Sequence, residues 1–308
     1  MSEANLSLTR RLWIYQAERI PLGKTALLVA VFSAAGVSAS AHFAGRALPG
    51  WEVFALAFGV TLAFFFHLRV FDEIKDAEDD ARYRPERPIP RGLVSLGLIV
   101  RLGLASTPLV VAACWLVEPA AIWLVLLTWG WMLLMGFEFF APRWLKAHPV
   151  IYMVSHMAIM PLIDLFVTGT EWAPHGAAPP GLALFLALSF VNGCILEMGR
   201  KLWAPEHERE GVDSYSALYG PVRAVTAWMA CVILALCLLA GVGFATGAPL
   251  PTFALGLVAA FFTLRAGLAY RQMPGAAQEK AVDTAAGLWV FACYVAAGFA
   301  PLIMQVLP

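Results

Sequence analysis

Residues 69–92 read RVFDEIKDAEDDARYRPERPIPRG, a stretch in which most residues are charged or proline. The sequence on both sides is apolar, and residues 53–66 and 102–117 carry no charged side chain at all. The whole chain has 308 residues, of which 60% are hydrophobic and only 14% are charged. Soluble domains contain about 25% charged residues. This composition leaves too little charge to cover a water-facing surface, and it predicts an integral membrane protein.

Apolar stretches recur along the whole sequence. They lie at roughly 21–44, 50–70, 93–116, 119–140, 148–168, 180–200, 221–245, 250–270 and 283–306. Each is close to the ~20 residues that an α-helix needs to cross the hydrocarbon core of a bilayer. We therefore predict an all-α polytopic membrane protein, a bundle of about nine transmembrane helices that forms a single domain over residues 1–308.

The distribution of basic residues predicts how the bundle is oriented. Arginine and lysine gather before the first apolar stretch and in every second connection, whereas the intervening connections are nearly bare. Arg46 is the main exception. Because basic loops stay on the cytoplasmic side, we expect a cytoplasmic amino terminus, an outside carboxyl terminus, and cytoplasmic acidic loops at about 69–92 and 197–220.

Three aspartates in the first acidic loop are spaced four residues apart. If the second helix continues past Arg69, then Asp72, Asp76 and Asp80 share one face, where like charges repel one another. Mg²⁺ would relieve this repulsion, because it prefers oxygen ligands and is often shared between carboxylates and a phosphate. Neighbouring arginines would grip the remaining phosphate oxygens. The alternative is a solvated charged loop, since further charged residues interleave with the aspartates.

These residues resemble a known signature. Arg69-Val-Phe-Asp-Glu-Ile-Lys-Asp-Ala-Glu-Asp-Asp80, followed by Arg87-Pro-Ile-Pro-Arg-Gly92, is similar to the first motif of UbiA-type intramembrane prenyltransferases, R-x-x-N-D-x-x-D-x-x-x-D and then R-P-I-P-S-G. That family has nine transmembrane helices with both acidic loops on the cytoplasmic side. The resemblance implies a Mg²⁺ site and a bound diphosphate. The metal ligands that it implies in this loop are Asp72, Glu73, Asp76 and Asp80, and the diphosphate-binding residues are Arg69 and Arg87. The family's N-D pair is Asp72-Glu73 here.

A second, shorter resemblance lies between the fourth and fifth apolar stretches. Residues 139–146, FFAPRWLK, resemble the family element Y-S-x-P-P-x-x-L-K, whose lysine approaches the diphosphate. The resemblance makes Lys146 a catalytic and diphosphate-binding candidate beside the three aspartates, although the aromatic-Ser part is lost. Without the first motif, Lys146 reads as a basic anchor on the cytoplasmic side.

The second acidic loop departs further from the family pattern, D-x-x-x-D-x-x-x-G-x-x-T-L. Gly211, Ser214 and Gly220 match its tail, but Trp203 and His207 occupy the two aspartate positions. In one interpretation, a second metal face and further diphosphate contacts lie here. The metal ligands would be Glu197, Glu206 and Glu210, and the diphosphate-binding residues would be Arg200 and Lys201. In the other interpretation, only Glu197 matters and the rest is a solvated loop.

Polar residues within apolar stretches are further candidates, because burying them in lipid is costly. They are His67, Glu138, His156, Asp164 and Asn192. Asp164 or His156 would contact an acceptor, or such residues would hydrogen-bond between helices. The cysteines form no C-x-x-C motif, the histidines form no H-x-x-x-H pair, and the net charge is zero. These features argue against zinc, haem and nucleic acid.

The resemblance implies a Mg²⁺-dependent enzyme that transfers a prenyl chain from a polyprenyl diphosphate to a hydrophobic acceptor, an aromatic or quinone precursor. We expect it in the lipid bilayer of a bacterial cytoplasmic membrane. The alternatives are an intramembrane terpene cyclase on the same scaffold and a non-catalytic lipid-binding or transport protein. A CDP-alcohol phosphotransferase is disfavoured, because its D-G-x-x-A-R element is missing.

Overall fold

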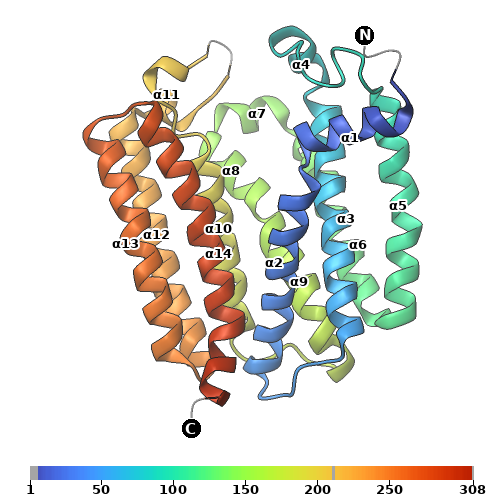
Figure 1. Cartoon of the computed structure of the whole chain (residues 1–308), viewed down its shortest axis with the longest axis vertical. Coiled ribbons are helices and arrows are strands. Elements are labelled where there is room, and N and C mark those ends of the chain that lie inside the picture. Colours follow the sequence, from blue (N-terminus) through green and yellow to red (C-terminus); the bar gives the residue numbers. More distant parts are fainter. Residues whose placement is uncertain (1–5, 210–211, 307–308) are drawn as a thin grey trace.

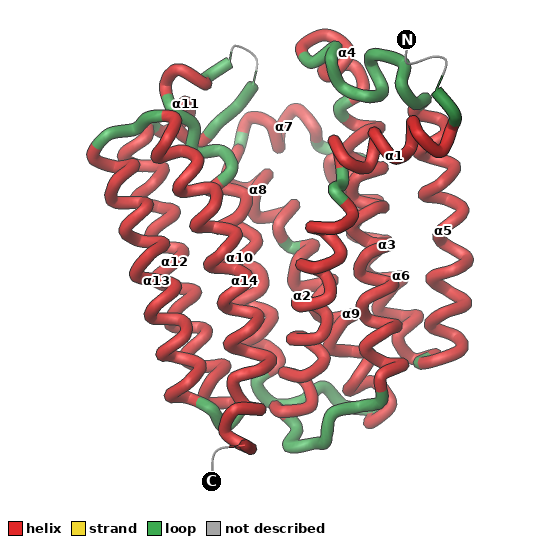
Figure 2. Tube along the Cα trace, in the orientation of Figure 1, coloured by secondary structure: helices red, strands yellow, loops and turns green. Residues whose placement is uncertain are grey.

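The computed structural model describes residues 6–209 and 212–306, and all of its regular secondary structure in these ranges is helical. Nine helical segments of the described residues are long and apolar enough to cross a membrane, which confirms the predicted fold class (Figures 1 and 2). They are α2 (Leu22–Phe43), α3 (Trp51–Lys75), α5 (Leu96–Val117), η2 with α6 (Pro119–Ala121 and Ile122–Gly136), α8 with α9 and η4 (Pro149–Met157, Ile159–Trp172 and Ala173–His175), α10 (Leu182–Gly199), α12 (Pro221–Ala245), α13 (Pro249–Gln272) and α14 (Ala276–Val306).

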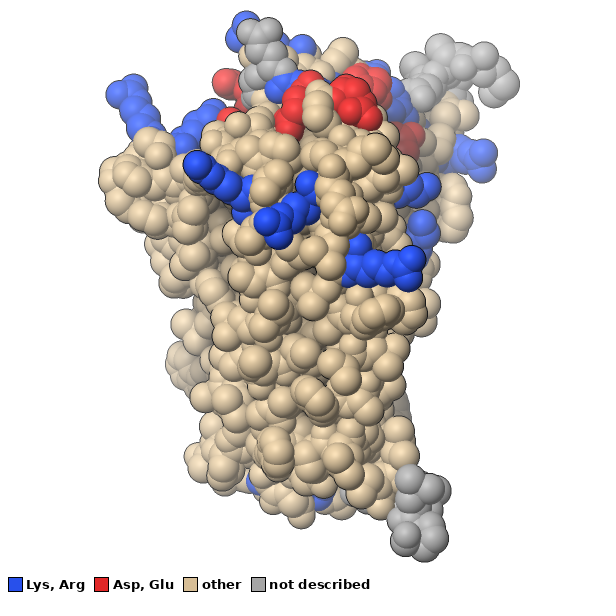
Figure 3. Space-filling view, turned by 90° about the vertical axis from the view of Figure 1, so that its left-hand side faces the viewer, with Lys and Arg blue, Asp and Glu red and all other residues tan. Residues whose placement is uncertain are grey.

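The short helices gather at one end of the bundle, which is the upper end in Figure 1. They are α1 (Leu8–Arg19), α4 (Ala77–Tyr83), η3 (Glu138–Phe140), α7 (Pro142–Ala147), η5 (Pro205–His207) and α11 (Tyr215–Tyr219). Both acidic loops belong to this end, while α14 ends at the opposite one (Figure 1). On the face drawn in Figure 3, charged side chains crowd the same upper end and the long flank below is almost bare. This end is called the charged end below.

The bundle closes through a contact between its first and last membrane helices. A Cβ added to Gly298 of α14 would lie 2.4 Å from the Cα of Ala35 in α2, so only glycine allows this approach. Most of the second half of α2, from Ser33 to Phe43, is buried, and it consists mainly of alanine, serine and glycine. Small residues let helix backbones come together in a membrane, where packing rather than water exclusion drives association.

Arg46, the exception to the charge bias, is neutralised at the end opposite the charged end. Its guanidinium donates two hydrogen bonds to Glu171, at 2.7 and 2.9 Å. Ser40 donates a third to the same carboxylate, at 2.6 Å. Glu171 is buried, and a buried carboxylate requires such partners. The basic residue therefore serves a structural ion pair, which removes the apparent conflict with the positive-inside pattern.

The proline-rich half of the first acidic loop forms a tight turn that packs down on the bundle. Gly92 adopts a positive φ of 80°, a conformation that glycine accepts without strain. Two backbone bonds, from Gly92 to Ile89 and from Leu93 to Pro88, close the turn. Leu93 and Tyr15 of α1 belong to one buried apolar cluster. The turn therefore fixes α1 against the first acidic loop.

Candidate functional site

The second membrane helix continues past Arg69, as expected, but it bends among the aspartates. Helix α3 ends at Lys75, Asp76 lies at the junction with φ −88° and ψ 2°, and α4 begins at Ala77. Backbone bonds nevertheless continue through the junction, from Asp76 to Asp72 at 2.8 Å and from Asp80 to Asp76 at 2.7 Å. The helical path is therefore preserved while its direction changes. Asp80 consequently points into a different environment from the other two aspartates.

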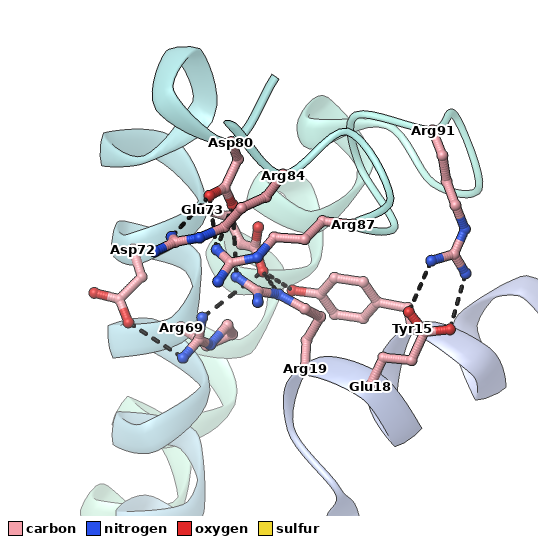
Figure 4. Close-up of polar contacts among 10 residues, drawn as sticks. All are labelled: Tyr15, Glu18, Arg19, Arg69, Asp72, Glu73, Asp80, Arg84, Arg87 and Arg91. Atoms are coloured by element: carbon pink, nitrogen blue, oxygen red, sulfur yellow. Dashed lines mark hydrogen bonds and ion pairs between the residues drawn. The ribbon is translucent and has the colours of Figure 1, made fainter. Parts of the chain in front are cut away.

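Asp80 is buried among arginines (Figure 4). It is 2% exposed. Arg87 donates to both carboxylate oxygens at 2.7 and 2.6 Å, and Arg84 donates to Oδ1 at 3.2 Å. Arg19 lies 3.9 Å away. These partners already use most of the roughly four lone-pair sites of the carboxylate.

The carboxylate of Glu73 is also buried against arginines. It is 4% exposed, and its Oε1 accepts hydrogen bonds from Arg19 at 2.7 Å and from Tyr15 at 3.3 Å. Arg69 adds an ion pair at 3.9 Å. Burial is the largest influence that raises the pKa of Tyr15, and the negative charge of Glu73 raises it further. Glu73 and Asp80 thus neutralise an arginine cluster in this structure, and their role as metal ligands stays a prediction.

The carboxylates of Asp72 and Asp76 remain available to a ligand. The side chain of Asp72 is 53% exposed, and its ion pair is with Arg69 at 3.3 Å. The carboxylate of Asp76 makes no hydrogen bond or ion pair with any residue that the structure describes. Burial raises the pKa of the Asp76 carboxyl above its ordinary value, and the negative charges of Asp72 and Asp80 raise it further. Two neighbouring carboxylates that repel each other and retain free lone pairs fit a Mg²⁺ ion shared with a phosphate ligand.

The end of α10 contributes the second charged group of the site. Glu197, in the last turn of α10, is 7% exposed. Its carboxylate accepts a hydrogen bond from the Nε of Arg200 at 2.6 Å. It also forms an ion pair with the Nζ of Lys201 at 2.9 Å. Both cations follow the last turn of the helix, where the helix dipole favours positive charge. Helix α10 packs against α8, and Tyr152 of α8 hydrogen-bonds to Lys75 at the end of α3, so the ends of α10 and α3 belong to the same part of the charged end.

The remaining acidic residues of the second loop serve other purposes. Glu206 accepts a hydrogen bond at 3.0 Å from the backbone nitrogen of Ala276, the first residue of α14. Glu210 lies outside the described residues. No group of three or more His, Cys, Asp or Glu side chains that would hold a metal occurs in the described part of the chain. In this structure Glu206 is tied to α14 and Glu197 lies among cations, so a second metal face at Glu197, Glu206 and Glu210 stays a prediction.

Lys75 belongs to a polar network that sequence reasoning did not find. Its Nζ donates to the hydroxyl of Tyr152 at 2.5 Å and lies 2.5 Å from Oε1 of Glu138. The Nε2 of His156 lies 3.5 Å from the other carboxylate oxygen of Glu138. The network joins α3 to η3 and α8. Glu138 and His156 stood out in the sequence as polar residues within apolar stretches, but no pattern joined them to Lys75 or Tyr152.

The backbone at this network is strained. Glu138, Phe139 and Phe140 have φ values of 49°, 50° and 58°, and each such residue other than glycine costs about 1–3 kcal/mol. The ring of Phe139 packs against Trp131 and His156, with centroids 5.3 and 5.9 Å apart. Lys146 follows on α7 with an exposed side chain, and it makes no hydrogen bond or ion pair within the described residues. The strained turn thus leads directly into the short helix that carries Lys146.

Three other polar residues of the spans hydrogen-bond between helices. Trp129 donates to the Nδ1 of His67 at 3.1 Å. Tyr294 donates to Asp164 at 2.5 Å, and Trp289 donates to Asn192 at 3.0 Å. Of the two alternatives, helix pairing is therefore the one that the structure supports for His67, Asp164 and Asn192.

The contribution of α1 was also missed by sequence reasoning, in which Arg19 served only to orient the chain. Arg19 and Tyr15 both reach the first acidic loop, and Arg91 fixes the same helix through two hydrogen bonds to Glu18, each 2.8 Å long (Figure 4). The hydrogen bond from Arg91 lowers the pKa of Glu18. No local spacing predicts contacts between residues so far apart in the sequence.

Comparisons with known proteins agree with this architecture. The sequence model of the UbiA prenyltransferase family matches residues 27–292. No curated protein matches the chain significantly. An apo UbiA homologue from Aeropyrum pernix K1 is 18% identical, with a TM-score of 0.65 and coverage of 91% of this chain and 98% of its own. A structure from work on digeranylgeranylglyceryl phosphate synthase in membranes is also 18% identical, with a TM-score of 0.62 and coverage of 94% and 99%. At this identity the two structures show a shared fold.

Proposed function

Because this chain belongs to the UbiA prenyltransferase family, we propose that it transfers a prenyl chain from a polyprenyl diphosphate to a hydrophobic acceptor, an aromatic or quinone precursor, with the help of Mg²⁺. Residues 1–308 form one catalytic domain. The charged end faces the cytoplasm of a bacterial cell, and the diphosphate binds there. The prenyl chain extends into the apolar bundle.

One observation carries the proposal: Asp72 and Asp76 remain open among cations, whereas Glu73 and Asp80 beside them are already neutralised. Arg69 lies next to Asp72 on α3, and the charge of Arg200 reaches Asp72 from α10. A ligand that brings both a divalent cation and a multiply charged anion would satisfy all of these groups. A metal–diphosphate complex has this composition.

The residues of this site would act on the departing diphosphate. In prenyl transfer, the bond between C1 of the prenyl chain and its oxygen breaks, and the diphosphate leaves with the electron pair. The acceptor then bonds to C1 and releases a proton. Bound Mg²⁺ would supply Lewis-acid stabilisation of the leaving group. Arg69, Arg200, Lys201 and Lys146 would stabilise the negative charge that grows on its oxygens. Groups held in position before the reaction are the most effective at this task.

The apolar bundle below the charged end would protect the electron-deficient prenyl carbon from water. Exclusion of water prevents side reactions of reactive intermediates. The His156–Glu138 pair lies next to Lys75 and so joins the site to the bundle interior. In this proposal, the charged end of the protein holds the diphosphate and the apolar bundle holds the prenyl chain.

The test is to incubate the purified protein with isotope-labelled prenyl diphosphates of several lengths and a membrane extract, and to identify prenylated products by mass spectrometry. The acceptors should include glycerol lipids, because one similar structure comes from work on digeranylgeranylglyceryl phosphate synthase. Asp76→Asn should abolish Mg²⁺-dependent release of diphosphate. Arg223→Gln is the matched control, because Arg223 is exposed on α12 and has no partner among the described residues.

Other outcomes identify the alternative functions. A cyclic product that forms without an acceptor would identify a terpene cyclase. Lipid binding that persists in Asp76→Asn, with no diphosphate release by either protein, would identify a carrier.

A further inference from the structure

The second loop presents positive charge where a second metal face was expected. Glu197 is buried and contacts two cations, Arg200 and Lys201, so this group carries a net positive charge. The side chain of Arg200 is 62% exposed. The end of α10 packs against α8, and Tyr152 of α8 hydrogen-bonds to Lys75 between Asp72 and Asp76. The two cations therefore stand at the same end of the bundle as these aspartates.

The loop behind these cations is fastened to the bundle. The hydroxyl of Tyr270 donates to the carbonyl of Trp203 at 2.6 Å. The indole of Trp203 donates to the carbonyl of Arg200 at 3.0 Å, and its backbone nitrogen donates to Ser216 at 2.8 Å. The Nζ of Lys201 lies 5.8 Å from the ring centroid of Tyr215. The backbone segment that carries Arg200 and Lys201 is therefore held in position.

Acidic side chains of the loop and of α14 also hold this segment in position. Glu208 accepts hydrogen bonds of 2.7 Å from Ser214 and Ser216. Glu279 accepts one from the backbone nitrogen of Ala204, also at 2.7 Å. Together with the contact of Glu206 to α14, these bonds use carboxylates that would otherwise be available to a metal ion.

We propose that this site binds a single divalent cation, at Asp72 and Asp76, and that Arg200 and Lys201 together take the place of a second metal ion on the diphosphate. The inference rests on the proposed function, since it takes a diphosphate as the ligand. A guanidinium presents several N–H donors in a planar fork that matches phosphate oxygens, and an ammonium adds a compact point charge. Glu197 is then a positioning residue that holds both cations, and it does not ligate the metal.

The number of bound metal ions tests this directly. The full chain in nanodiscs is titrated with Mn²⁺ in the presence of saturating inorganic pyrophosphate, and free Mn²⁺ is measured by electron paramagnetic resonance. We expect one Mn²⁺ per chain that depends on pyrophosphate, and its loss in Asp76→Asn. Two such ions per chain would overturn the inference and leave the proposed function standing. If neither Mn²⁺ nor pyrophosphate binds, both fail.

Two variants test the role of the cations through pyrophosphate affinity. In Arg200→Gln/Lys201→Gln, we expect pyrophosphate binding to weaken about ten-fold or more, since charge-assisted hydrogen bonds are lost, while the Mn²⁺ count stays at one. Arg223→Gln, on α12, should match the unmodified protein. Unchanged pyrophosphate affinity in the double variant would refute the role of Arg200 and Lys201.

Glu197→Gln distinguishes an anchor from a ligand by the sign of its effect. If Glu197 only anchors the two cations, removing its charge leaves the Mn²⁺ count unchanged, and pyrophosphate binding is retained or strengthened because a negative charge has gone. A lower Mn²⁺ affinity in a folded Glu197→Gln protein would show that Glu197 ligates the metal, which contradicts the inference. The double variant keeps the test decisive if Glu197→Gln fails to fold.

Discussion

Asp76 and Asp80 are equivalent in the sequence spacing, and the structure predicts opposite consequences when each is replaced by asparagine. Asp80→Asn removes the negative charge that neutralises Arg84 and Arg87 inside a buried cluster. Asp76→Asn removes a charge that has no partner among the described residues and that is repelled by its neighbours. We expect Asp80→Asn to destabilise the protein, and Asp76→Asn to abolish metal binding without destabilising it.

The size of the first effect follows from the contacts. Asp80 is 2% exposed and accepts three hydrogen bonds from two guanidiniums, at 2.6, 2.7 and 3.2 Å. Breaking a buried pair costs about 3–5 kcal/mol, while a hydrogen bond to a charged group contributes about 1.5–3 kcal/mol. Asparagine keeps one acceptor oxygen and both arginines are partly exposed, so we expect a loss of about 2–4 kcal/mol, between these limits.

The second effect has the opposite sign. The pKa of Asp76 is raised in the folded protein, so its ionisation disfavours folding, and the stability that goes with its neutral form is lost as the pH rises through the folded pKa. At neutral pH a neutral asparagine should therefore be tolerated or slightly stabilising, by about 0.2–0.5 kcal/mol for each like-charge pair that is relieved.

The assay is reversible unfolding in mixed micelles by titration with sodium dodecyl sulfate, followed by far-ultraviolet circular dichroism. Binding of Mn²⁺ in the presence of pyrophosphate is measured on the same preparations. Arg223→Gln serves as the control for charge removal at this end of the bundle. The reasoning is refuted if Asp80→Asn unfolds like the unmodified protein and loses metal binding, because Asp80 would then be a ligand.

Three further predictions test other parts of the structure. Gly298→Val should destabilise the fold by about 1–3 kcal/mol or more, because overpacking forces α2 and α14 apart. Gly59→Val should not destabilise it, because a Cβ at Gly59 meets nothing within 4 Å. Equal stability of the two variants would contradict the close approach of α2 and α14. Glu138→Gln should lower the unfolding free energy by about 1–3 kcal/mol because Lys75 loses its anion, and Lys75→Met should reduce this cost in a double-mutant cycle, whereas additive losses would argue against the ion pair. Mn²⁺ affinity in the presence of pyrophosphate should fall as the pH is lowered through the raised pKa of Asp76, at a pH above the ordinary aspartate value of 3.8; a decline that begins only below that value would exclude Asp76 as the titrating ligand.

Much of the fold was predictable because membrane spans have a strong and local signal. A run of apolar residues long enough to cross the bilayer specifies a helix, since every backbone polar group must find its partner within the segment. The nine expected spans correspond to those in the structure. Their boundaries differ where charge continues along a helix: α3 extends to Lys75, beyond the residue 70 expected from hydropathy. The side of the membrane that each end faces stays a prediction.

The site was less predictable, because residue spacing does not reveal side-chain partners. Spacing placed Asp72, Asp76 and Asp80 on one helix face, but the bend at Asp76 turns Asp80 into the arginine cluster. Similarly, Glu206 lies in a loop that resembles an acidic motif, yet it contacts the first residue of α14, far along the chain. Glu206 contacts a residue distant in the sequence, whereas Asp80 bonds to Arg84 and Arg87, four and seven residues away, and spacing alone reveals neither contact.

The first acidic loop carries its carboxylates for two purposes that only their surroundings distinguish. A site that holds a diphosphate needs several arginines close together, and these repel one another when the ligand is absent. Glu73 and Asp80 offset that repulsion permanently, because they are buried against Arg19 and Arg87. If Asp72 and Asp76 were paired in the same way, no carboxylate would remain for the metal ion that accompanies the diphosphate. Under the proposed function, the dense alternation of acid and base keeps the arginine cluster folded before the ligand arrives and leaves two carboxylates free to bind it.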